Sequence, residues 1–180
     1  MGDDAGAAVD EGAQQLEELD RNLSAVGEWA HGTHVAGIAV GGGSRVANLQ
    51  GQAYDANLVF SIEPAFTSAD LTTVLETQAS QTARIHTNSW GDDNTDEYTG
   101  LARAVDAFMH DYEDNLVLFA ATNGPTLASP ENAKNCVSVV ESQDTPNQNA
   151  ALCAGQATAS GLTSDGRLKP DVFAPGCGTL

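Results

Sequence analysis

The chain carries the run His-Gly-Thr-His-Val-Ala-Gly at residues 31–37, and this stretch decides how the rest of the sequence is interpreted. Histidine is the side chain that takes up and returns a proton near neutral pH. Gly32 leaves room beside the His31 imidazole for another chain to approach. The run therefore indicates a catalytic histidine at the start of a helix, next to accessible backbone.

The two histidines of this run also permit a metal-binding interpretation and a purely structural one. His31 and His34 stand three apart and could share a helix face as a metal pair, but no His-Glu-x-x-His pattern and no later Cys/His cluster supports a metal site. We therefore expect no metal ligand here, a catalytic base at His31 and a structural role for His34. No motif surrounds His86 or His110, so neither carries a functional prediction.

All seven positions of the run match the histidine motif of the subtilases, the subtilisin-like serine peptidases. Further segments resemble the same family in the family's order, and together they cover most of the chain from His31 onward; they are residues 52–59, 83–91, 118–125 and 165–176. The second of them has the form typical of a bacterial alkaline-protease branch. The first resembles a turn that leads into a buried strand, and the last resembles the approach to the family's serine.

The segment 118–125 resembles the family's oxyanion-hole segment and places an asparagine at position 123. The resemblance implies that the Asn123 side-chain amide stabilises the negative charge that develops on the scissile carbonyl oxygen. Asn-Gly is also a strong turn dipeptide, so a plain turn at Asn123 and Gly124 is the structural alternative. Thr122 stands where the family usually has glycine.

Ser89, Trp90 and Gly91 would, by the same resemblance, line the cleft and bind the substrate backbone as an added strand. Gly91 would let the substrate come close. The structural alternative is an ordinary strand end with Trp90 in the core. Asp92 departs from the family pattern, which often has a second glycine there.

Two triad members are not found among these residues by motif. The family's serine motif, Gly-Thr-Ser-Met-Ala, does not occur, and neither Ser160 nor Ser164 has a nucleophile-like context. Asp10 in Val-Asp-Glu-Gly is similar to the family's Asp-Thr-Gly, but it lies too close to His31 and no hydrophobic run precedes it. We therefore expect the chain to be an internal fragment, with the nucleophile beyond Leu180 and the triad aspartate upstream of Met1.

The composition is strongly acidic, with 25 Asp and Glu against 7 Lys and Arg and a net charge of −18. This balance excludes nucleic-acid binding and suits a high-salt or calcium-rich setting. Residues 3–20 are acidic without a base, and residues 92–97 form a second acidic loop; a solvated acidic face is favoured over a calcium site in both. The acidity is compatible with a structural calcium ion, and the chemistry requires no organic cofactor.

No stretch of eighteen apolar residues occurs, so no membrane span is predicted. The three cysteines are too few for a disulfide scaffold and allow at most one internal pair; they are Cys136, Cys153 and Cys177.

Short apolar runs predict buried strands at 57–62, 84–88, 116–121 and 136–140. Helical spacing follows Ser68, a candidate N-cap, and recurs over residues 101–112. Strands that alternate with helices predict an α/β fold with a mostly parallel sheet, covered on both faces. With the resemblance, this implies a subtilisin-like three-layer fold, incomplete at both ends, with residues 1–25 as an acidic N-terminal segment and residues 26–180 as a partial peptidase domain.

The predicted function is therefore that of a serine endopeptidase fragment, in which His31 is the base and Asn123 binds the oxyanion. The resemblance implies peptide or protein substrates and an extracellular or secreted location. One alternative is a subtilase-like peptide-binding module that has lost its nucleophile. A weaker one is an unrelated acidic α/β binding domain.

Overall fold

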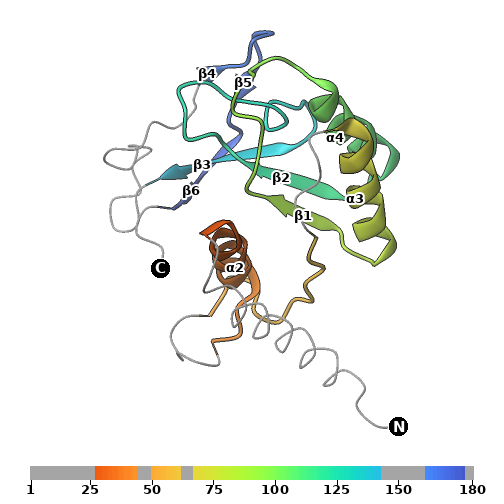
Figure 1. The fold of residues 1–180 in the computed structure, drawn as a ribbon, viewed down its shortest axis with the longest axis vertical. Coiled ribbons are helices and arrows are strands. Elements are labelled where there is room, and N and C mark those ends of the chain that lie inside the picture. Colours follow the sequence, from red (N-terminus) through yellow and green to blue (C-terminus); the bar gives the residue numbers. More distant parts are fainter. Residues whose placement is uncertain (1–26, 44–49, 62–66, 143–160, 177–180) are drawn as a thin grey trace. The chain divides into compact units, whose positions relative to one another are not determined.

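The computed structural model describes residues 27–43, 50–61, 67–142 and 161–176. The chain divides at Phe60 and Ser61 into an N-terminal unit and a C-terminal unit, each compact in itself (Figure 1). The acidic segment 1–25, with Asp10 and the predicted boundary after it, lies outside the described residues. Ser160, Cys153 and Cys177 lie outside them as well.

The N-terminal unit is built on helix α2 (Gly27–Val40), which contains the whole histidine run. A returning segment covers the C-terminal end of this helix. Gln52 and Ala53 donate their backbone N–H groups to the carbonyls of Ile38 and Ala39, at 3.0 and 2.8 Å. These bonds satisfy carbonyl groups that have no partner inside the helix.

Gly51 makes this packing feasible. A Cβ atom built at Gly51 would lie 2.5 Å from the nitrogen of Gly41 and 2.7 Å from that of Val40, which no side chain tolerates. Glycine at position 51 is therefore required by the close approach of two backbone segments.

The strand predicted over residues 57–62 is wrong for the described part of that range, residues 57–61, which form no strand. Leu58 and Phe60 are 38% and 47% exposed. The Phe60 ring lies 3.8 Å from where a Cβ of Gly32 would stand, so Phe60 lies beside α2. A short apolar run predicts burial or extension, but it forms a strand only when a neighbouring strand pairs with it.

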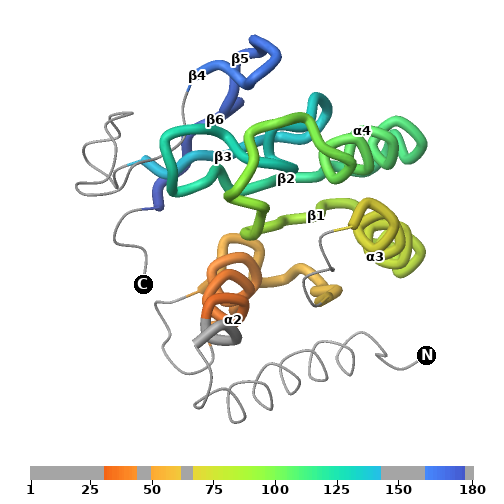
Figure 2. The backbone as a smooth tube through the Cα atoms, turned by 45° about the horizontal axis from the view of Figure 1, so that its top comes forward, coloured from red at the N-terminus to blue at the C-terminus, as the bar shows by residue number. Residues whose placement is uncertain are grey.

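The C-terminal unit contains a four-stranded parallel sheet in the order β1-β2-β3-β6 (Figure 2). Its strands are β1 (Ile85–Asn88), β2 (Leu116–Ala120), β3 (Val137–Ser142) and β6 (Val172–Pro175). A separate antiparallel pair consists of β4 (Gly161–Leu162) and β5 (Leu168–Lys169). Three of the predicted strands and the mostly parallel α/β arrangement are confirmed.

Helices α3 (Ser68–Ser80) and α4 (Gly100–Asp111) lie side by side and cover one face of this sheet (Figure 1). Apolar side chains of both helices pack with residues of β2 in one core cluster, which includes Leu71, Leu75, Leu101, Val105, Phe108, Val117 and Phe119. The N-cap of α3 is Thr67, not the predicted Ser68, since the Thr67 hydroxyl accepts a hydrogen bond from Asp70 N at 3.2 Å. Thr99 caps α4 in the same way.

The opposite face of the sheet carries apolar side chains that remain exposed. Ile85 is 70% exposed, its register partner Leu116 is 38% exposed, and Val172 in β6 is 45% exposed. Within the C-terminal unit, the described helices therefore cover one face of the sheet.

Candidate active site

His31 lies in the second turn of α2, and its imidazole is exposed. His34 is also exposed, so any structural role of His34 does not consist of packing in the core. On the same helix, Ala36 is buried. The structure therefore presents His31 on a helix with its ring accessible to solvent, as a base that exchanges protons must be.

The other predicted site residues all follow strands of the parallel sheet. Ser89, Trp90 and Gly91 come directly after β1, and Asn123 lies in the loop after β2, the neighbouring strand. In parallel sheets, binding and catalytic groups collect at the carboxyl ends of strands. The structure therefore brings these four residues to one end of the sheet.

Backbone bonds tie the two loops together. Asp92 N donates to Ser129 O at 2.8 Å, and Ser129 N donates to Thr95 O at 3.1 Å. A Cβ atom at Gly91 would lie 3.3 Å from Ser129 O. The close approach at Gly91 is therefore one between two segments of the chain itself, a reason for glycine that sequence reasoning did not find.

Trp90 is half-buried and packs against the core cluster. Its indole Nε1 donates to Asn88 Oδ1 at 3.1 Å, and its ring meets Phe119 edge to face with the centroids 5.3 Å apart. The structural alternative for the Trp90 side chain is thus present in the fold. The substrate-binding role predicted for residues 89–91 concerns the backbone and stays a prediction.

The loop that carries Asn123 is held by a buried carboxylate, Glu131, which is 2% exposed. One oxygen, Oε1, accepts three hydrogen bonds: from Thr122 N at 2.9 Å, from Thr122 Oγ1 at 2.8 Å and from Ala128 N at 2.8 Å. The Asn123 side chain itself is exposed. The loop is therefore fixed by a residue of the interior, while its asparagine is exposed to solvent.

Burial raises the pKa of Glu131, and the hydrogen bonds from Thr122 and Ala128 oppose that rise. The nearby Asp93 carboxylate raises the pKa further, because two negative charges repel. Sequence reasoning missed Glu131, since nothing in its local sequence distinguishes it from the other acidic residues.

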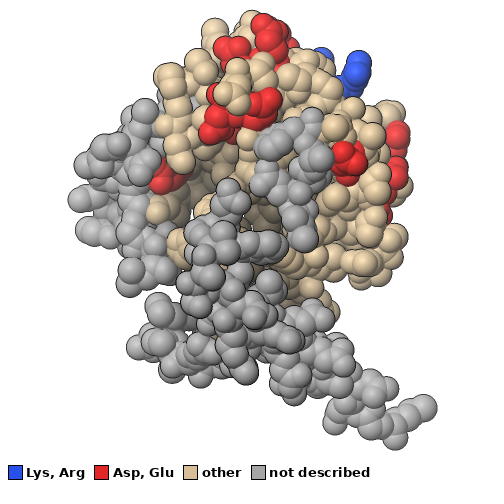
Figure 3. All heavy atoms as spheres, in the orientation of Figure 1, with Lys and Arg blue, Asp and Glu red and all other residues tan. Residues whose placement is uncertain are grey.

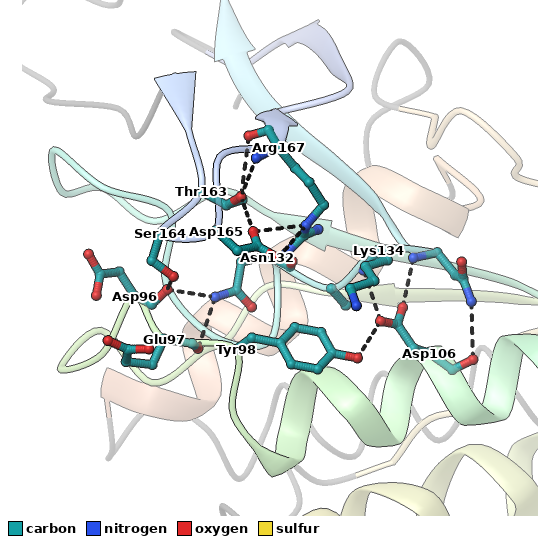
Figure 4. A network of polar contacts seen from close by, with 12 residues as sticks. Asp96, Glu97, Tyr98, Asp106, Asn132, Lys134, Thr163, Ser164, Asp165 and Arg167 are labelled. Atoms are coloured by element: carbon teal, nitrogen blue, oxygen red, sulfur yellow. Dashed lines mark hydrogen bonds and ion pairs between the residues drawn. The ribbon is translucent and has the colours of Figure 1, made fainter.

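A polar network holds the acidic loop after β1 in place (Figure 4). Asn132 Nδ2 donates to the carbonyls of Asp96 and Glu97, both at 3.0 Å, and the Ser164 hydroxyl donates to Asp96 O at 3.0 Å. Arg167 pairs with Asp165 at 2.9 Å, and this partner lowers the pKa of Asp165 to about 2. Ser164 is thus a hydrogen-bond donor within this network.

Tyr98 anchors the other end of the same network to α4. Its hydroxyl donates to Asp106 Oδ2 at 2.7 Å, and burial raises the pKa of Tyr98 to about 12.

Acidic side chains gather on the upper part of the face shown in Figure 3. Among the described residues, no group of three or more His, Cys, Asp or Glu side chains could hold a metal ion.

Lys169 is a buried lysine in strand β5, within the segment 165–176 that resembles the family. Lys169 Nζ donates to Cys136 O at 2.7 Å and to Asp171 Oδ2 at 2.6 Å, and the same Asp171 oxygen accepts from Ser138 N at 2.8 Å. Burial raises the pKa of Asp171, but the bonds from Lys169 and Ser138 outweigh it and leave that pKa below its usual value. The Cys136 thiol is buried, which raises its pKa to about 11.

His31 belongs to the N-terminal unit, whereas Asn123 and Ser89 belong to the C-terminal unit. The joint role predicted for His31 as base and Asn123 as oxyanion donor therefore stays a prediction. No helix in the described part of the chain is both long and apolar enough to cross a membrane.

Comparison with known families decides the class of the chain. The model of the subtilase family, Peptidase S8, matches residues 6–179. The chain belongs to the subtilase family. This membership removes the alternative of an unrelated acidic α/β domain.

Two curated relatives of this subtilase come from Dictyostelium discoideum. The serine protease/ABC transporter B family protein tagA is 26% identical over 150 residues, which are 74% of this chain and 8% of tagA. Its relative tagB is 32% identical over 126 residues, which are 61% of this chain and 7% of tagB. The chain thus spans less than a tenth of the length of these relatives.

A solved structure shares the fold. The prenylagaramide maturation protease PagA matches with a TM-score of 0.52 and 22% identity, over 81% of this chain and 51% of PagA. At that identity the likeness concerns the fold alone. It agrees with the parallel sheet and the helices described above.

Proposed function

We propose that this subtilase chain supplies the general base and the oxyanion donor of a serine endopeptidase. The observation that carries the proposal is the complete histidine motif of residues 31–37 on α2, with the His31 ring exposed, in a chain that the subtilase family model matches. The nucleophilic serine and the triad aspartate come from outside these 180 residues.

In this mechanism, His31 takes the proton of the serine hydroxyl as its oxygen attacks the peptide carbonyl carbon. The carbonyl π electrons move to the oxygen, and Asn123 donates a hydrogen bond to that oxyanion. His31 then returns the proton to the leaving amine as the C–N bond breaks. Water repeats the sequence on the acyl-enzyme, and an aspartate holds the imidazole tautomer.

Ser89, Trp90 and Gly91 would bind the substrate as an added strand. Their position after β1 supports this role, because β1 ends the strand order of the described sheet and has one side without a strand partner there. Such an edge binds extended peptides through main-chain hydrogen bonds.

We further propose an extracellular or secreted location and peptide or protein substrates, both from family membership. The acidity of the chain suits a surrounding rich in salt or calcium, where cations screen carboxylate repulsion. A structural calcium ion is compatible with this setting.

The second candidate is a peptide-binding module of subtilase fold without a nucleophile. It is kept because the family's serine motif does not occur among the 180 residues. The neighbouring sequence discriminates: an Asp-Thr-Gly motif before this chain and a Gly-Thr-Ser-Met motif after it support the enzyme.

The direct test uses a serine-directed fluorophosphonate on the complete protein. The proposed enzyme labels at one serine, and His31→Ala abolishes labelling because the serine loses its base. His110→Gln is the matched control, since His110 is exposed at the end of α4 and labelling should persist. Peptide binding without labelling or hydrolysis would support the binding module instead.

A further inference from the structure

Glu131 holds a position unusual for an acidic residue. Its side chain is among the largest that are fully buried, in a chain with 25 acidic residues in all. Burying a carboxylate is costly unless hydrogen bonds compensate. Three donors converge on Oε1, and such donors stabilise the ionised form of a carboxylate.

The donors mark both ends of one loop. Thr122 directly precedes Asn123, and Ala128 closes the loop before Glu131. Thr122 contributes both its backbone N–H and its hydroxyl, so the residue next to Asn123 is held in backbone and in side chain. Thr122 replaces the usual glycine of the family, and its hydroxyl gives Glu131 a bond that glycine could not provide.

Further contacts hold the carboxylate and its loop in place. The Cys136 thiol donates to Glu131 O at 3.4 Å, which binds the residue to the start of β3. The Thr122 hydroxyl also lies 3.5 Å from Asp93 Oδ1, in the loop after β1. The Asn123 loop is therefore fixed to its neighbours at several points, while Asn123 remains exposed.

We propose that Glu131 is a positioning residue: its buried carboxylate fixes the backbone on either side of Asn123, so that the Asn123 amide is held ready for the oxyanion. This inference rests on the proposed function. Oxyanion stabilisation depends on a donor fixed before charge develops, and a loop that must reorganise loses part of that stabilisation. Glu131 acts through Asn123 and touches no substrate.

The first experiment tests, without any catalysis, whether Glu131 holds the Asn123 loop in place, an action called the clamp below. Native-state hydrogen exchange on the chain compares the wild type with Glu131→Gln, which keeps one acceptor oxygen and removes the charge. Charge-assisted hydrogen bonds are roughly twice as strong as neutral ones. We expect the amides of Thr122 and Ala128 to exchange at least tenfold faster, with Val140 in β3 unchanged.

Glu113→Gln is the matched control, because Glu113 is exposed and lies beyond the end of α4. It should leave both loop amides unchanged. Glu131→Ala is avoided, since it strands three donors and could prevent folding. Exchange at Thr122 and Ala128 that stays within twofold of the wild type overturns the clamp.

The second experiment tests whether the clamp serves Asn123. In the complete peptidase, Glu131→Gln should lower kcat about tenfold with KM within twofold, and Asn123→Ala should lower kcat about 100- to 1,000-fold. The double variant should be no slower than Asn123→Ala alone. Independent losses that multiply would show that Glu131 does not act through Asn123.

The two experiments separate the two ideas. Accelerated exchange in a complete protein that hydrolyses nothing refutes the proposed function and supports the clamp. Hydrolysis that depends on His31 and Asn123, with no change in exchange or kcat for Glu131→Gln, supports the enzyme and refutes the positioning role.

Discussion

Replacing Lys169 with methionine should destabilise the C-terminal unit and change its response to acid. The Lys169 side chain is only 4% exposed, and its Nζ bonds to the carbonyl of Cys136 and to the carboxylate of Asp171. Methionine keeps an apolar stem of similar length and removes both bonds. The carbonyl of Cys136, a buried residue just before β3, then loses its charged donor.

The magnitude follows from these two bonds. Hydrogen bonds to charged groups contribute about 1.5–3 kcal/mol each. The Asp171 side chain is 38% exposed and keeps its bonds from Ser138, so water compensates part of that loss. We expect Lys169→Met to lower the free energy of unfolding by about 2–4 kcal/mol, less than the full cost of breaking a buried pair.

The bond between Lys169 and Asp171 should also affect how the stability of the fold depends on pH. The folded pKa of Asp171 is below its ordinary value of 3.8, so this group stabilises the fold above that value and the contribution is lost as the pH falls through the folded pKa. Without Lys169, burial raises the pKa of Asp171 with less opposition. Acid unfolding of Lys169→Met should therefore begin at higher pH than in the wild type.

Urea denaturation at neutral pH and in a series down to pH 2 measures both effects. Lys134→Met is the control, because Lys134 is the only other lysine, is exposed, and lies 4.7 Å over the Tyr98 ring. That variant should lose under about 1 kcal/mol. If Lys169→Met loses no more than Lys134→Met, or if its acid limb does not move, the reasoning about the buried pair is refuted.

Three further predictions concern the whole chain and one helix. The 180 residues should stay unlabelled by a fluorophosphonate, because they contain no Gly-Thr-Ser-Met-Ala motif; labelling at Ser164 or any other serine contradicts this. Molar salt should raise the melting temperature, since it shortens the Debye length to about 3 Å and screens the net charge of −18; equal, high transitions in low and molar salt would disprove it. Thr67→Ala should cost about 1 kcal/mol by removing the N-cap of α3, whereas Thr73→Ala, in the exposed interior of that helix, should cost less; equal losses in urea melts exclude the cap.

Local patterns in the sequence were sufficient for helices α3 and α4 and for three strands of the parallel sheet. Apolar spacing predicted α3 and α4, and the same side chains face the core, because burial on one side of a helix repeats with the helical period. Strand prediction succeeded for β1, β2 and β3, where neighbouring strands pair. It failed at residues 57–61, because pairing depends on a partner that the run itself does not contain.

The candidate site divides in the same way. Its chemistry-bearing residues, His31 and Asn123, stand in short motifs that a reader of the sequence can find. The residues that hold the surrounding structure in place do not stand in such motifs. Glu131 and Lys169 look like ordinary surface charges in the sequence, and the glycine at 91 looks like an opening for substrate.

The sequence by itself determined the family motif, the alternation of strands and helices, and the acidic character of the chain. Only the tertiary structure decided that Glu131 holds the Asn123 loop, that Lys169 is buried against Asp171, and that Gly91 faces Ser129. The physical reason is that a charge is stable in the interior only when partners from other segments surround it. Several of those partners lie far apart in the sequence, since Lys169 and Asp171 bond to Cys136 and Ser138, each 33 residues earlier, and no local pattern records such separations.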